Sequence, residues 1–452
     1  MELEETAQNV LKRLLDHGYS AYVVGGCVRD TLLGRTPGDW DICTAALPEE
    51  VEQCFSEYRI VETGLKHGTV TVFMQGEPVE ITTFRRDGEY FNHRSPRQVA
   101  FVGSLREDLQ RRDFTVNAMA AGLDGKLIDL FDGQADLEKR VIRCVGDPDQ
   151  RFQEDALRIL RAMRFASKLD FSIEPKTAAA MERNKSLLRE ISGERIYREL
   201  TEMLIGTGVS AVLNQFGAVL QVVLPEIKPA MGFLQRSPYH NRDVWGHTIE
   251  AVGHSAPDLL VRWTLLLHDL GKPACFTLDA AGIGHFYGHP IYSEELTKNI
   301  FTRLHVDKVT MEKVGELVRH HDEDVLPNRK TVRRWINRYG SDLLFQLLEV
   351  KRADCLAHVK TQRSVARYNA VIEFTKLARQ VLEEEQCFSV RDLAVNGKDV
   401  LAMGVRPGPQ VGCLLGRLLD DVLEERCCNE RKALLQRMHE IIESEKGRNH
   451  AD

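Results

Sequence analysis

The stretch from residue 22 to residue 44, YVVGGCVRDTLLGRTPGDWDICT, constrains the fold of this 452-residue chain more than any other part of the sequence. Its first three residues are apolar and predict a short strand. Gly25 and Gly26 follow at once, and the next residues, which carry Arg29, predict a helix. Glycines at a strand-to-helix turn let the backbone approach a phosphate, and the helix N-terminus supplies free N–H groups and a partial positive charge. The stretch therefore predicts a phosphate-binding turn.

Two carboxylates stand near the end of the same stretch. Asp39 and Asp41 are two residues apart, and in an extended segment residues i and i+2 project on the same side. Holding two carboxylates side by side is costly unless a divalent cation lies between them, and oxygen ligands suit Mg²⁺. Glu80, in a strand predicted over residues 78–84, is either a third carboxylate that points toward this pair or an ordinary exposed strand residue. The spacing predicts a magnesium site.

The order of a strand, a glycine pair, a helix with Arg-Asp and then Asp-x-Asp resembles the signature of the nucleotidyltransferases of the DNA polymerase β superfamily. Within that group, VGGCVRDTLLG and DWDICT are similar to the bacterial tRNA nucleotidyltransferase and poly(A) polymerase family, the class II CCA-adding enzymes. The resemblance implies that Asp39 and Asp41 hold two catalytic Mg²⁺ ions. It also implies that Gly26 and Arg29 bind the triphosphate of the incoming nucleotide.

A second block, RRDFTVNAMA, occupies residues 111–120. Arg112, Asp113 and Asn117 are spaced to cap a helix and brace it against the active-site sheet. The resemblance implies that Arg112 contacts the triphosphate or the ribose.

Between these blocks, residues 85–98 are rich in arginine and have little apolar patterning. This predicts a mobile charged loop that runs into a helix over 104–111, and any solvated surface loop would have the same composition. The family keeps a loop of the form Tyr-x-x-x-Arg-x-Pro at this place, which Tyr90, Arg94 and Pro96 match. In the family that loop is required for adding the terminal A, so the resemblance implies an enzyme that is not restricted to C.

A basic helix is predicted over residues 150–167. Arg158, Arg161 and Arg164 recur every three residues and Asp155 precedes them by about one turn, so at 100° per residue the four share one broad face. The residues alone fit either a solvated, salt-bridged helix face or a binding surface.

The family resemblance makes a sharper assignment for this helix. Glu154, Asp155 and Arg158 match the Glu-Asp-x-x-Arg element that serves in the family as an amino-acid template for the incoming base. An aspartate accepts a hydrogen bond from the exocyclic amino group of C or A, so one aspartate selects both bases over U and G. The arginine of the element donates to a ring nitrogen or carbonyl. The resemblance also implies that Arg161 and Arg164 reach phosphates.

The middle of the chain carries a second set of polar residues. His247 lies in WGHTIEA, His268 and Asp269 lie in LLLHDLGKP, and Asp354 lies in KRADCLAH. This ordered set resembles the HD superfamily of metal-dependent phosphohydrolases, which implies that the four residues hold a divalent metal such as Mn²⁺, Ni²⁺, Fe²⁺ or Zn²⁺. A metal-binding hydrolase and a retained scaffold both fit the pattern. Two further histidines are available for a second metal, His289 and His320.

The remaining patterns are those of a mainly helical chain with one small sheet near its start. Apolar periodicity predicts helices over 3–18, 48–58, 192–204 and 208–230 and strands over 68–74 and 78–84. In the helix over 192–204, Arg195 and Glu199 are interpreted as a structural brace of the neck. The loop at 404–412, rich in glycine and proline, is either a helix connector or, by resemblance, part of the region that grips the elbow of tRNA.

The expected fold class is α+β. A nucleotidyltransferase head with a small mixed sheet and helices is predicted over residues 1–140. All-α regions follow: a neck over 141–235, an HD region over 236–360 and a tail over 361–452.

Composition limits the class of protein. No apolar run approaches 18 residues, so no membrane span is expected, and the acidic amphipathic N-terminus is not a signal or transit peptide. The ten cysteines form no C-x-x-C pair and fit reduced thiols in the cytoplasm. The net charge of −7 argues against a nucleic-acid partner, but residues 139–198 hold 14 Lys/Arg and 9 Asp/Glu, a local +5 that can contact phosphates.

Together these features predict an enzyme that adds CMP, CMP and AMP from CTP and ATP to the 3′ end of tRNA with Mg²⁺. A poly(A) polymerase and an A-adding enzyme are the alternatives within the family. Poly(A) polymerases typically have a different residue run after Glu-Asp and a basic C-terminal extension, whereas this chain has EDALR and ends in EKGRNHAD. An alternative of another class is a phosphohydrolase whose HD site acts on 2′,3′-cyclic phosphates at RNA ends.

Overall fold

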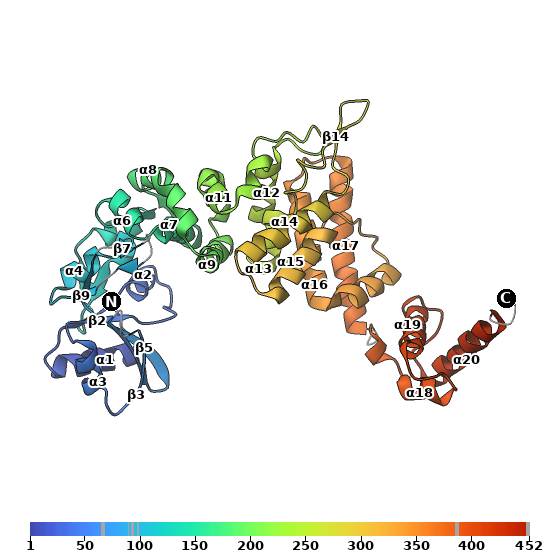
Figure 1. Cartoon of the computed structure of the whole chain (residues 1–452), viewed down its shortest axis with the longest axis horizontal. Helices are drawn as coiled ribbons and strands as arrows, with labels where there is room; N and C mark the ends of the chain where they lie inside the picture. Colours follow the sequence, from blue (N-terminus) through green and yellow to red (C-terminus); the bar gives the residue numbers. More distant parts are fainter. Residues whose placement is uncertain (65–67, 89, 92–94, 97–98, 385–387, 449–452) are drawn as a thin grey trace. The chain divides into compact units, whose positions relative to one another are not determined.

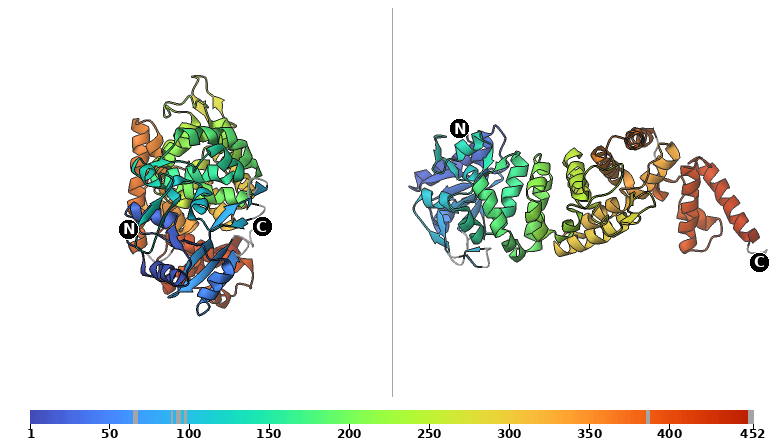
Figure 2. Two further views of the ribbon diagram at one scale, coloured as in Figure 1. Left: turned by 90° about the vertical axis from the view of Figure 1, so that its left-hand side faces the viewer. Right: turned by 90° about the horizontal axis from the view of Figure 1, so that it is seen from above.

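The computed structural model describes the chain except for residues 65–67, 89, 92–94, 97–98, 385–387 and 449–452. Its internal contacts divide the chain into two units. The first unit comprises Met1–Pro229 and Lys298–Asp307, and the second comprises Ala230–Thr297 and Lys308–Asp452. The sheet lies in the N-terminal part of the first unit, and helices make up most of the rest (Figures 1 and 2).

The head is built on one seven-stranded mixed sheet of strand order β11-β10-β1-β2-β5-β4-β3. Only β2 and β5 pair in parallel, and every other neighbouring pair in this sheet is antiparallel. This confirms the small mixed sheet expected from the sequence. The strands are β1 (Ala21–Val24), β2 (Ile42–Thr44), β3 (Arg59–Gly64), β4 (Thr69–Met74), β5 (Glu77–Thr83), β10 (Met119–Ala121) and β11 (Leu127–Asp129).

Short helices accompany the sheet. The predicted N-terminal helix is α1 (Glu5–Asp16), which buries Ala7, Val10, Leu11 and Leu14 along one stripe. Glycine at the end of β1 starts α2, and proline at the first helical position starts α3. The other helices of the head are α2 (Gly26–Leu32), α3 (Pro48–Cys54), α4 (Leu105–Gln110), the 3₁₀ helix η2 (Thr115–Asn117) and α5 (Gly133–Glu138).

The predicted charged loop over 85–98 contains short strands instead of continuous irregular backbone. Strand β6 (Arg85–Asp87) pairs with β9 (Val99–Phe101), and β7 (Tyr90–Phe91) pairs with β8 (Ser95–Pro96). The apolar run at Val99–Phe101 supplies the β-forming partner that the arginine-rich segment lacks by itself. Arg94 of the loop motif lies outside the described residues.

The neck is helical apart from one parallel strand pair, β12 (Val141–Ile142) with β13 (Ser172–Ile173), so the expectation of an all-α neck is wrong in this detail. The single basic helix predicted over 150–167 is likewise two helices, because Asp155 takes extended backbone angles between α6 and α7. The neck helices are α6 (Pro148–Glu154), α7 (Leu157–Leu169), α8 (Pro175–Asn184), η3 (Lys185–Glu190), α9 (Gly193–Leu204), α10 (Val209–Gln215), α11 (Gly217–Val223) and η4 (Pro225–Ala230).

The second unit begins with six helices and one short hairpin. Leu344 and Leu347 of α16 share a buried core with Val371 and Phe374 of α17. The elements are α12 (Val244–His254), α13 (Leu259–Leu267), β14 (Thr277–Leu278), β15 (Gly284–His285), α14 (His289–Arg303), α15 (Lys308–His320), α16 (Arg329–Ala357) and α17 (Gln362–Glu384). The end of α14, from Lys298 onward, belongs to the first unit.

The tail has an apolar core of its own, in which Leu418, Leu434 and Met438 are buried. Its elements are η5 (Val390–Asp392), α18 (Gly397–Ala402), α19 (Pro409–Leu423) and α20 (Arg431–Arg448). Gly404 and Gly408 have φ values of 85° and 149° in the loop between α18 and α19, which confirms a tight loop there. The predicted loop over 404–412 is too long, because α19 begins at Pro409 and Gly412 is helical. Among the described residues, no helix is both long enough and apolar enough to cross a membrane.

Candidate functional site

The glycine turn at the end of β1 is lined by charged groups. Gly25 has φ 84° and ψ −127°, and a Cβ there would lie 3.0 Å from Arg112 Nη1 and 4.0 Å from Asp41 Oδ2. A Cβ at Gly26 would lie 3.7 Å from Arg29 Nη2. The turn therefore needs glycine at its first position, and it brings two guanidinium groups and a carboxylate to the start of α2.

The carboxylates meet because of the pairing of β1, β2 and β5. The carbonyl of Asp41 accepts a hydrogen bond from Val24 N at 2.9 Å, and Ile42 is in register with Ile81, which places Asp41 beside Glu80 across the parallel pair. The pKa of Asp41 is raised to about 6, chiefly by burial and also by the nearby charges of Asp39 and Glu80. The guanidinium of Arg112 partly offsets this rise. Glu80 thus lies near the pair. Three carboxylates whose mutual repulsion raises a pKa form a site that a divalent cation would stabilise.

The two arginines at the turn are held by residues of their own domain. The guanidinium of Arg112 pairs with buried Asp108 at 3.2 Å. Arg29 donates to Asn117 Oδ1 at 2.6 Å and to both carboxylate oxygens of Asp30 at 2.8 Å. The expectation that the 111–120 block braces a helix is confirmed by the contact of Asn117 with α2. The proposed triphosphate contacts of both arginines stay predictions.

The residues expected to select the base lie where α6 gives way to α7. Asp155 Oδ1 accepts from Leu157 N at 3.1 Å, and its Oδ2 accepts from Arg195 Nη2 at 3.2 Å. Arg158 donates to Glu154 at 2.8 Å and to the carbonyl of Arg111 at 3.0 Å. Asp155 and Arg158 are therefore each fixed by a separate partner, and they do not share a helix face as the periodicity suggested.

The other two arginines of α7 are paired inside the protein. Arg161 donates to Asp113 Oδ2 from Nε at 2.8 Å and from Nη2 at 2.5 Å. Arg164 lies 3.2 Å from Glu199 Oε2. Glu199 therefore pairs with α7, and Arg195 pairs with Asp155, which supports the interpretation of these two residues as a brace of the neck. The predicted phosphate contacts of Arg161 and Arg164 stay untested.

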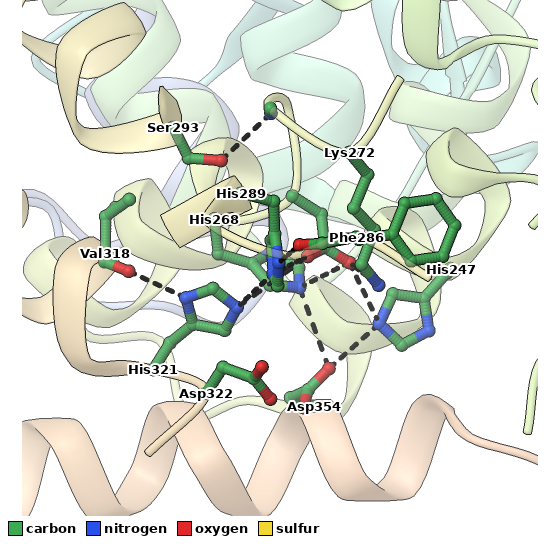
Figure 3. A network of polar contacts seen from close by, with 12 residues as sticks. His247, His268, Lys272, Phe286, His289, Ser293, Val318, His321, Asp322 and Asp354 are labelled. Carbon is green, nitrogen blue, oxygen red and sulfur yellow. Dashed lines mark hydrogen bonds and ion pairs between the residues drawn. The ribbon is translucent and has the colours of Figure 1, made fainter. Parts of the chain in front are cut away.

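A second cluster in the other unit gathers four imidazoles around two carboxylates (Figure 3). The two shortest contacts join His247 Nε2 to Asp354 Oδ1 at 2.9 Å and His268 Nε2 to Asp269 Oδ2 at 3.1 Å. All four residues are nearly completely buried. The structure thus brings together the four residues predicted from the HD pattern. The imidazoles are those of His247, His268, His289 and His321, and the carboxylates are those of Asp269 and Asp354.

The tautomers of three histidines leave free lone pairs. The Nδ1 atoms of His268, His289 and His321 lie 2.7, 2.8 and 2.7 Å from backbone carbonyls three residues earlier. Because a carbonyl can only accept, each Nδ1 carries a proton, and each Nε2 presents a lone pair when its imidazole is neutral. His289 Nε2 lies 3.3 Å from His321 Nε2 and 3.3 Å from Asp269 Oδ1. Facing lone pairs beside carboxylates suit divalent metal ions, and second hydrogen bonds of this kind orient metal-binding histidines.

The pKa values of two imidazoles in this cluster are shifted in opposite directions. Burial would lower the pKa of His268, but Asp269 outweighs it and raises that pKa to about 10. Burial lowers the pKa of His321 to about 4. His268 Nε2 and both oxygens of Asp269 are buried without a hydrogen-bond partner among the described residues. The donor set of imidazole nitrogens and carboxylate oxygens fits a transition metal.

Sequence reasoning named the wrong neighbour for the second metal and missed two histidines. His320 is turned to Glu323 and Arg338, and His321 is the residue in the cluster. Both histidines are buried, but α15 ends at His320 and the two side chains point in different directions, so only His321 faces Asp269. His240 and His358 adjoin His247, with ring centroids 5.0 Å from it in both cases. Their only sequence signal is that they are histidines flanking the motif.

A cavity of about 670 Å³ opens over this cluster. Asp269, His321 and Asp354 are among the residues that line it, and Lys272 Nζ forms an ion pair with Asp269 Oδ2 at 2.7 Å. The lining also contains basic and aromatic residues, among them Arg319, Arg363, Arg367, Tyr239 and Phe286, and the acidic residues Asp322 and Glu323. Such a cavity can hold an anionic ester against a metal pair.

Three family models match parts of the chain. Residues 21–143 match the poly A polymerase head domain, residues 170–231 match the family described as a probable RNA and SrmB-binding site of polymerase A, and residues 293–438 match a second domain of tRNA nucleotidyltransferases. The chain is 37% identical over 434 residues to a CCA-adding enzyme of Levilactobacillus brevis, covering 95% of this chain and 96% of the relative. It is 35% identical over 435 residues to one of Enterococcus faecalis, covering 96% and 95%.

Solved structures agree with these relatives. The CCA-adding enzyme of Bacillus stearothermophilus in complex with CTP matches with a TM-score of 0.72 and 30% identity, covering 98% of both chains. A Thermotoga maritima CCA-adding enzyme complexed with tRNA, at a TM-score of 0.58 and 19% identity, shares the fold. The chain therefore belongs to the bacterial class II family of CCA-adding enzymes and poly(A) polymerases.

Proposed function

We propose that the chain adds CMP, CMP and AMP, taken from CTP and ATP, to the 3′ end of tRNA without a nucleic-acid template. The observation that carries the proposal is the convergence of Asp41, Asp39 and Glu80 beside the Gly25–Gly26 turn. Relatives of full length that are named CCA-adding enzymes support it. The cysteines of the described residues are free thiols, which suits the reducing cytoplasm in which we place the reaction.

In this proposal Asp39 and Asp41 hold Mg²⁺, with Glu80 as a further oxygen donor. The bound Mg²⁺ supplies activation of the terminal 3′-hydroxyl and neutralisation of the leaving pyrophosphate. Arg112 and the N–H groups at the start of α2 orient the triphosphate, with Gly26 giving its backbone room to approach. Positioning and charge neutralisation then account for most of the rate enhancement.

Base choice is assigned to Asp155 and Arg158. Asp155 is anchored by Leu157 N and Arg195, and each of its carboxylate oxygens keeps a lone pair that can accept from cytosine N4 or adenine N6. Arg158 is held by Glu154 and donates to the ring edge. A site that recognises both bases favours CCA addition over a poly(A) polymerase or an A-adding enzyme. In the tail, the loop around Gly404 and Gly408 is assigned to the elbow of tRNA, through backbone N–H contacts to phosphate.

We also propose a second, metal-dependent activity at the HD cluster. The observation that favours it is that the Nε2 atoms of His268, His289 and His321 all face Asp269, beside a cavity whose lining includes several arginines. His247, His268, Asp269 and Asp354 hold one Mn²⁺, Ni²⁺, Fe²⁺ or Zn²⁺ ion, and His289 with His321 serves a second. The bound metal supplies a hydroxide nucleophile at neutral pH. The substrate we assign is a 2′,3′-cyclic phosphate at an RNA end.

Two substitutions separate the activities. Asp41→Ala should abolish nucleotide addition to tRNA and leave hydrolysis of a 2′,3′-cyclic nucleotide intact, while Asp269→Ala should do the reverse. Both variants are assayed on the same tRNA preparation, with Mg²⁺ and with Mn²⁺ or Ni²⁺. If Asp41→Ala still adds nucleotides at the wild-type rate, the assignment of the head site is wrong. If wild-type protein loaded with each metal fails to hydrolyse the cyclic ester, the HD cluster is a scaffold.

A further inference from the structure

One aromatic ring in the first unit is surrounded by three arginine side chains. Phe165 of α7 is 8% exposed. The guanidinium carbons of Arg29, Arg161 and Arg164 lie 5.2, 5.5 and 4.5 Å from the centroid of its ring. Arg29 comes from α2 of the head, and the other two come from α7 of the neck. Phe114 packs edge-on to the same ring, with centroids 5.8 Å apart.

Three like charges so close together need compensation. Asp30 takes two hydrogen bonds from Arg29, and Asp113 takes two from Arg161. The negative face of the aromatic ring adds a smaller attraction for each cation. This arrangement gathers cations that would otherwise repel one another in a partly desolvated place.

The third arginine, Arg164, forms an ion pair with Glu199 that lacks a hydrogen bond. Arg164 and Glu199 are 3.2 Å apart, yet Arg164 Nε and Glu199 Oε2 are both buried without a hydrogen bond to any described atom. A buried donor without an acceptor costs about 1–3 kcal/mol. Arg164 is therefore held by an ion pair that lacks hydrogen bonds of the kind that Arg29 and Arg161 make within the described residues.

The arginine cluster extends to the glycine turn. Arg29 is its member in the head, and Arg29 Nη2 is the nearest side-chain atom to the place of a Cβ at Gly26. Asp41 Oδ2 is on the neighbouring side of the turn, at Gly25. One end of the cluster thus lies where the proposed site holds phosphate, and the other end lies on α7, the helix that also carries Arg158.

We infer that Phe165 is a positioning residue for nucleotide addition, whose ring holds Arg29, Arg161 and Arg164 as one cationic cluster for the triphosphate of the incoming nucleotide. The inference rests on the proposed function and adds a residue that the sequence marks only as apolar. Because CTP and ATP share the triphosphate, Phe165 acts on both nucleotides equally. Asp155, in contrast, acts on the base.

The test compares Phe165→Leu, which keeps an apolar side chain without a ring, with Phe165→Tyr, which keeps the ring. Phe216→Leu is the matched control, because Phe216 is 5% exposed in the same unit and lies between α10 and α11. Binding of inorganic tripolyphosphate with Mg²⁺ is measured by calorimetry, and KM and kcat are measured separately for CTP and ATP. Phe165→Leu should weaken tripolyphosphate binding about tenfold and raise both KM values about tenfold, with kcat within about twofold of wild type. Phe165→Tyr should restore both quantities.

Unchanged tripolyphosphate binding in Phe165→Leu would overturn the inference, and so would a fall in kcat at constant KM. A change in KM for only one nucleotide would also contradict it. If Phe165→Leu does not fold, Arg164→Gln is measured in the same assays. The inference predicts weaker binding of tripolyphosphate to this variant, and unchanged binding would contradict it. Failure of the proposed function is distinguishable, because wild-type protein would then add no nucleotide at all.

Discussion

Asp113 and Arg161 join the head to the neck: two N–H groups of Arg161 donate to one carboxylate oxygen, Oδ2, at 2.8 and 2.5 Å. The other oxygen of Asp113 accepts from Asn117 at 3.2 Å, and Asn117 in turn accepts from Arg29 of the glycine turn. Through these contacts Arg29 beside the glycine turn of the head and helix α7 of the neck are held in one network.

Asp113→Asn should lower the free energy of unfolding by about 2 kcal/mol near neutral pH, because it leaves the buried side of Arg161 without its counter-charge. Asp149→Asn is the control. Its pair with Arg183 is exposed, so its loss should cost less than about 1 kcal/mol. Urea unfolding of the three proteins measures the difference, and equal costs for the two variants would contradict this account.

The ion pair between Asp113 and Arg161 should make the free energy of unfolding depend on pH. Burial alone would raise the pKa of Asp113, but Arg161 outweighs burial and lowers it to about 2. A carboxyl whose pKa is lower in the folded state contributes stability above its ordinary pKa and loses it as the pH falls to the folded value. The stability gap between wild type and Asp113→Asn should therefore be constant above about pH 4 and narrow between about pH 4 and pH 2. A gap that persists unchanged at pH 2 would contradict the ion pair.

Magnesium binding to the head should release protons near pH 6. The raised pKa of Asp41 means that the metal-free site is protonated below about pH 6, so Mg²⁺ must displace that proton. The affinity for Mg²⁺ should fall about tenfold between pH 7 and pH 5, as expected for one competing proton. Calorimetry in two buffers of different ionisation enthalpy measures the release. Glu80→Gln should weaken binding, while Glu77→Gln at the exposed end of the same strand should not.

The HD cluster offers a matched pair of adjacent histidines. His321→Ala should reduce the metal bound per chain, because its Nε2 lies 3.3 Å from that of His289 and faces Asp269. His320→Ala should leave metal content unchanged, because its ring is turned to Glu323 and Arg338. Elemental analysis after loading with Mn²⁺ or Ni²⁺ gives the comparison. Equal metal content in the two variants would remove His321 from the site.

Loss of base selection should follow from Asp155→Ala. The variant should bind Mg²⁺ normally but incorporate UMP or GMP about 10- to 100-fold more often relative to CMP and AMP, because the acceptor for the amino group is gone. Competition assays with pairs of nucleotides measure this ratio. An unchanged ratio would assign base choice to another residue.

The head could be predicted from the sequence because its signals are local. The glycine turn, the Asp-x-Asp pair and the strands around them depend on neighbours in the chain, and the structure bears out the mixed sheet that they indicate. The ordered HD residues also converge as expected, although they come from segments far apart.

Partners that come from distant segments could not be predicted in the same way. Arg158 pairs locally with Glu154, but nothing local says that Asp113 and Glu199 are the counter-charges of Arg161 and Arg164. The break at Asp155 was missed because the apolar pattern continues through it. The sequence pointed to His320 instead of His321, because tertiary packing decides which side chain at the end of α15 faces the cluster.

The most direct test of the central claim is the length of the product formed on a tRNA that ends at the discriminator base. Purified protein is given CTP alone, ATP alone, or both, with Mg²⁺. The account predicts two added nucleotides with CTP alone and three, CCA, with both. A long run of A would instead identify a poly(A) polymerase, and a single A added only to tRNA already ending in CC would identify an A-adding enzyme. Either result, or no addition at all, would contradict the account.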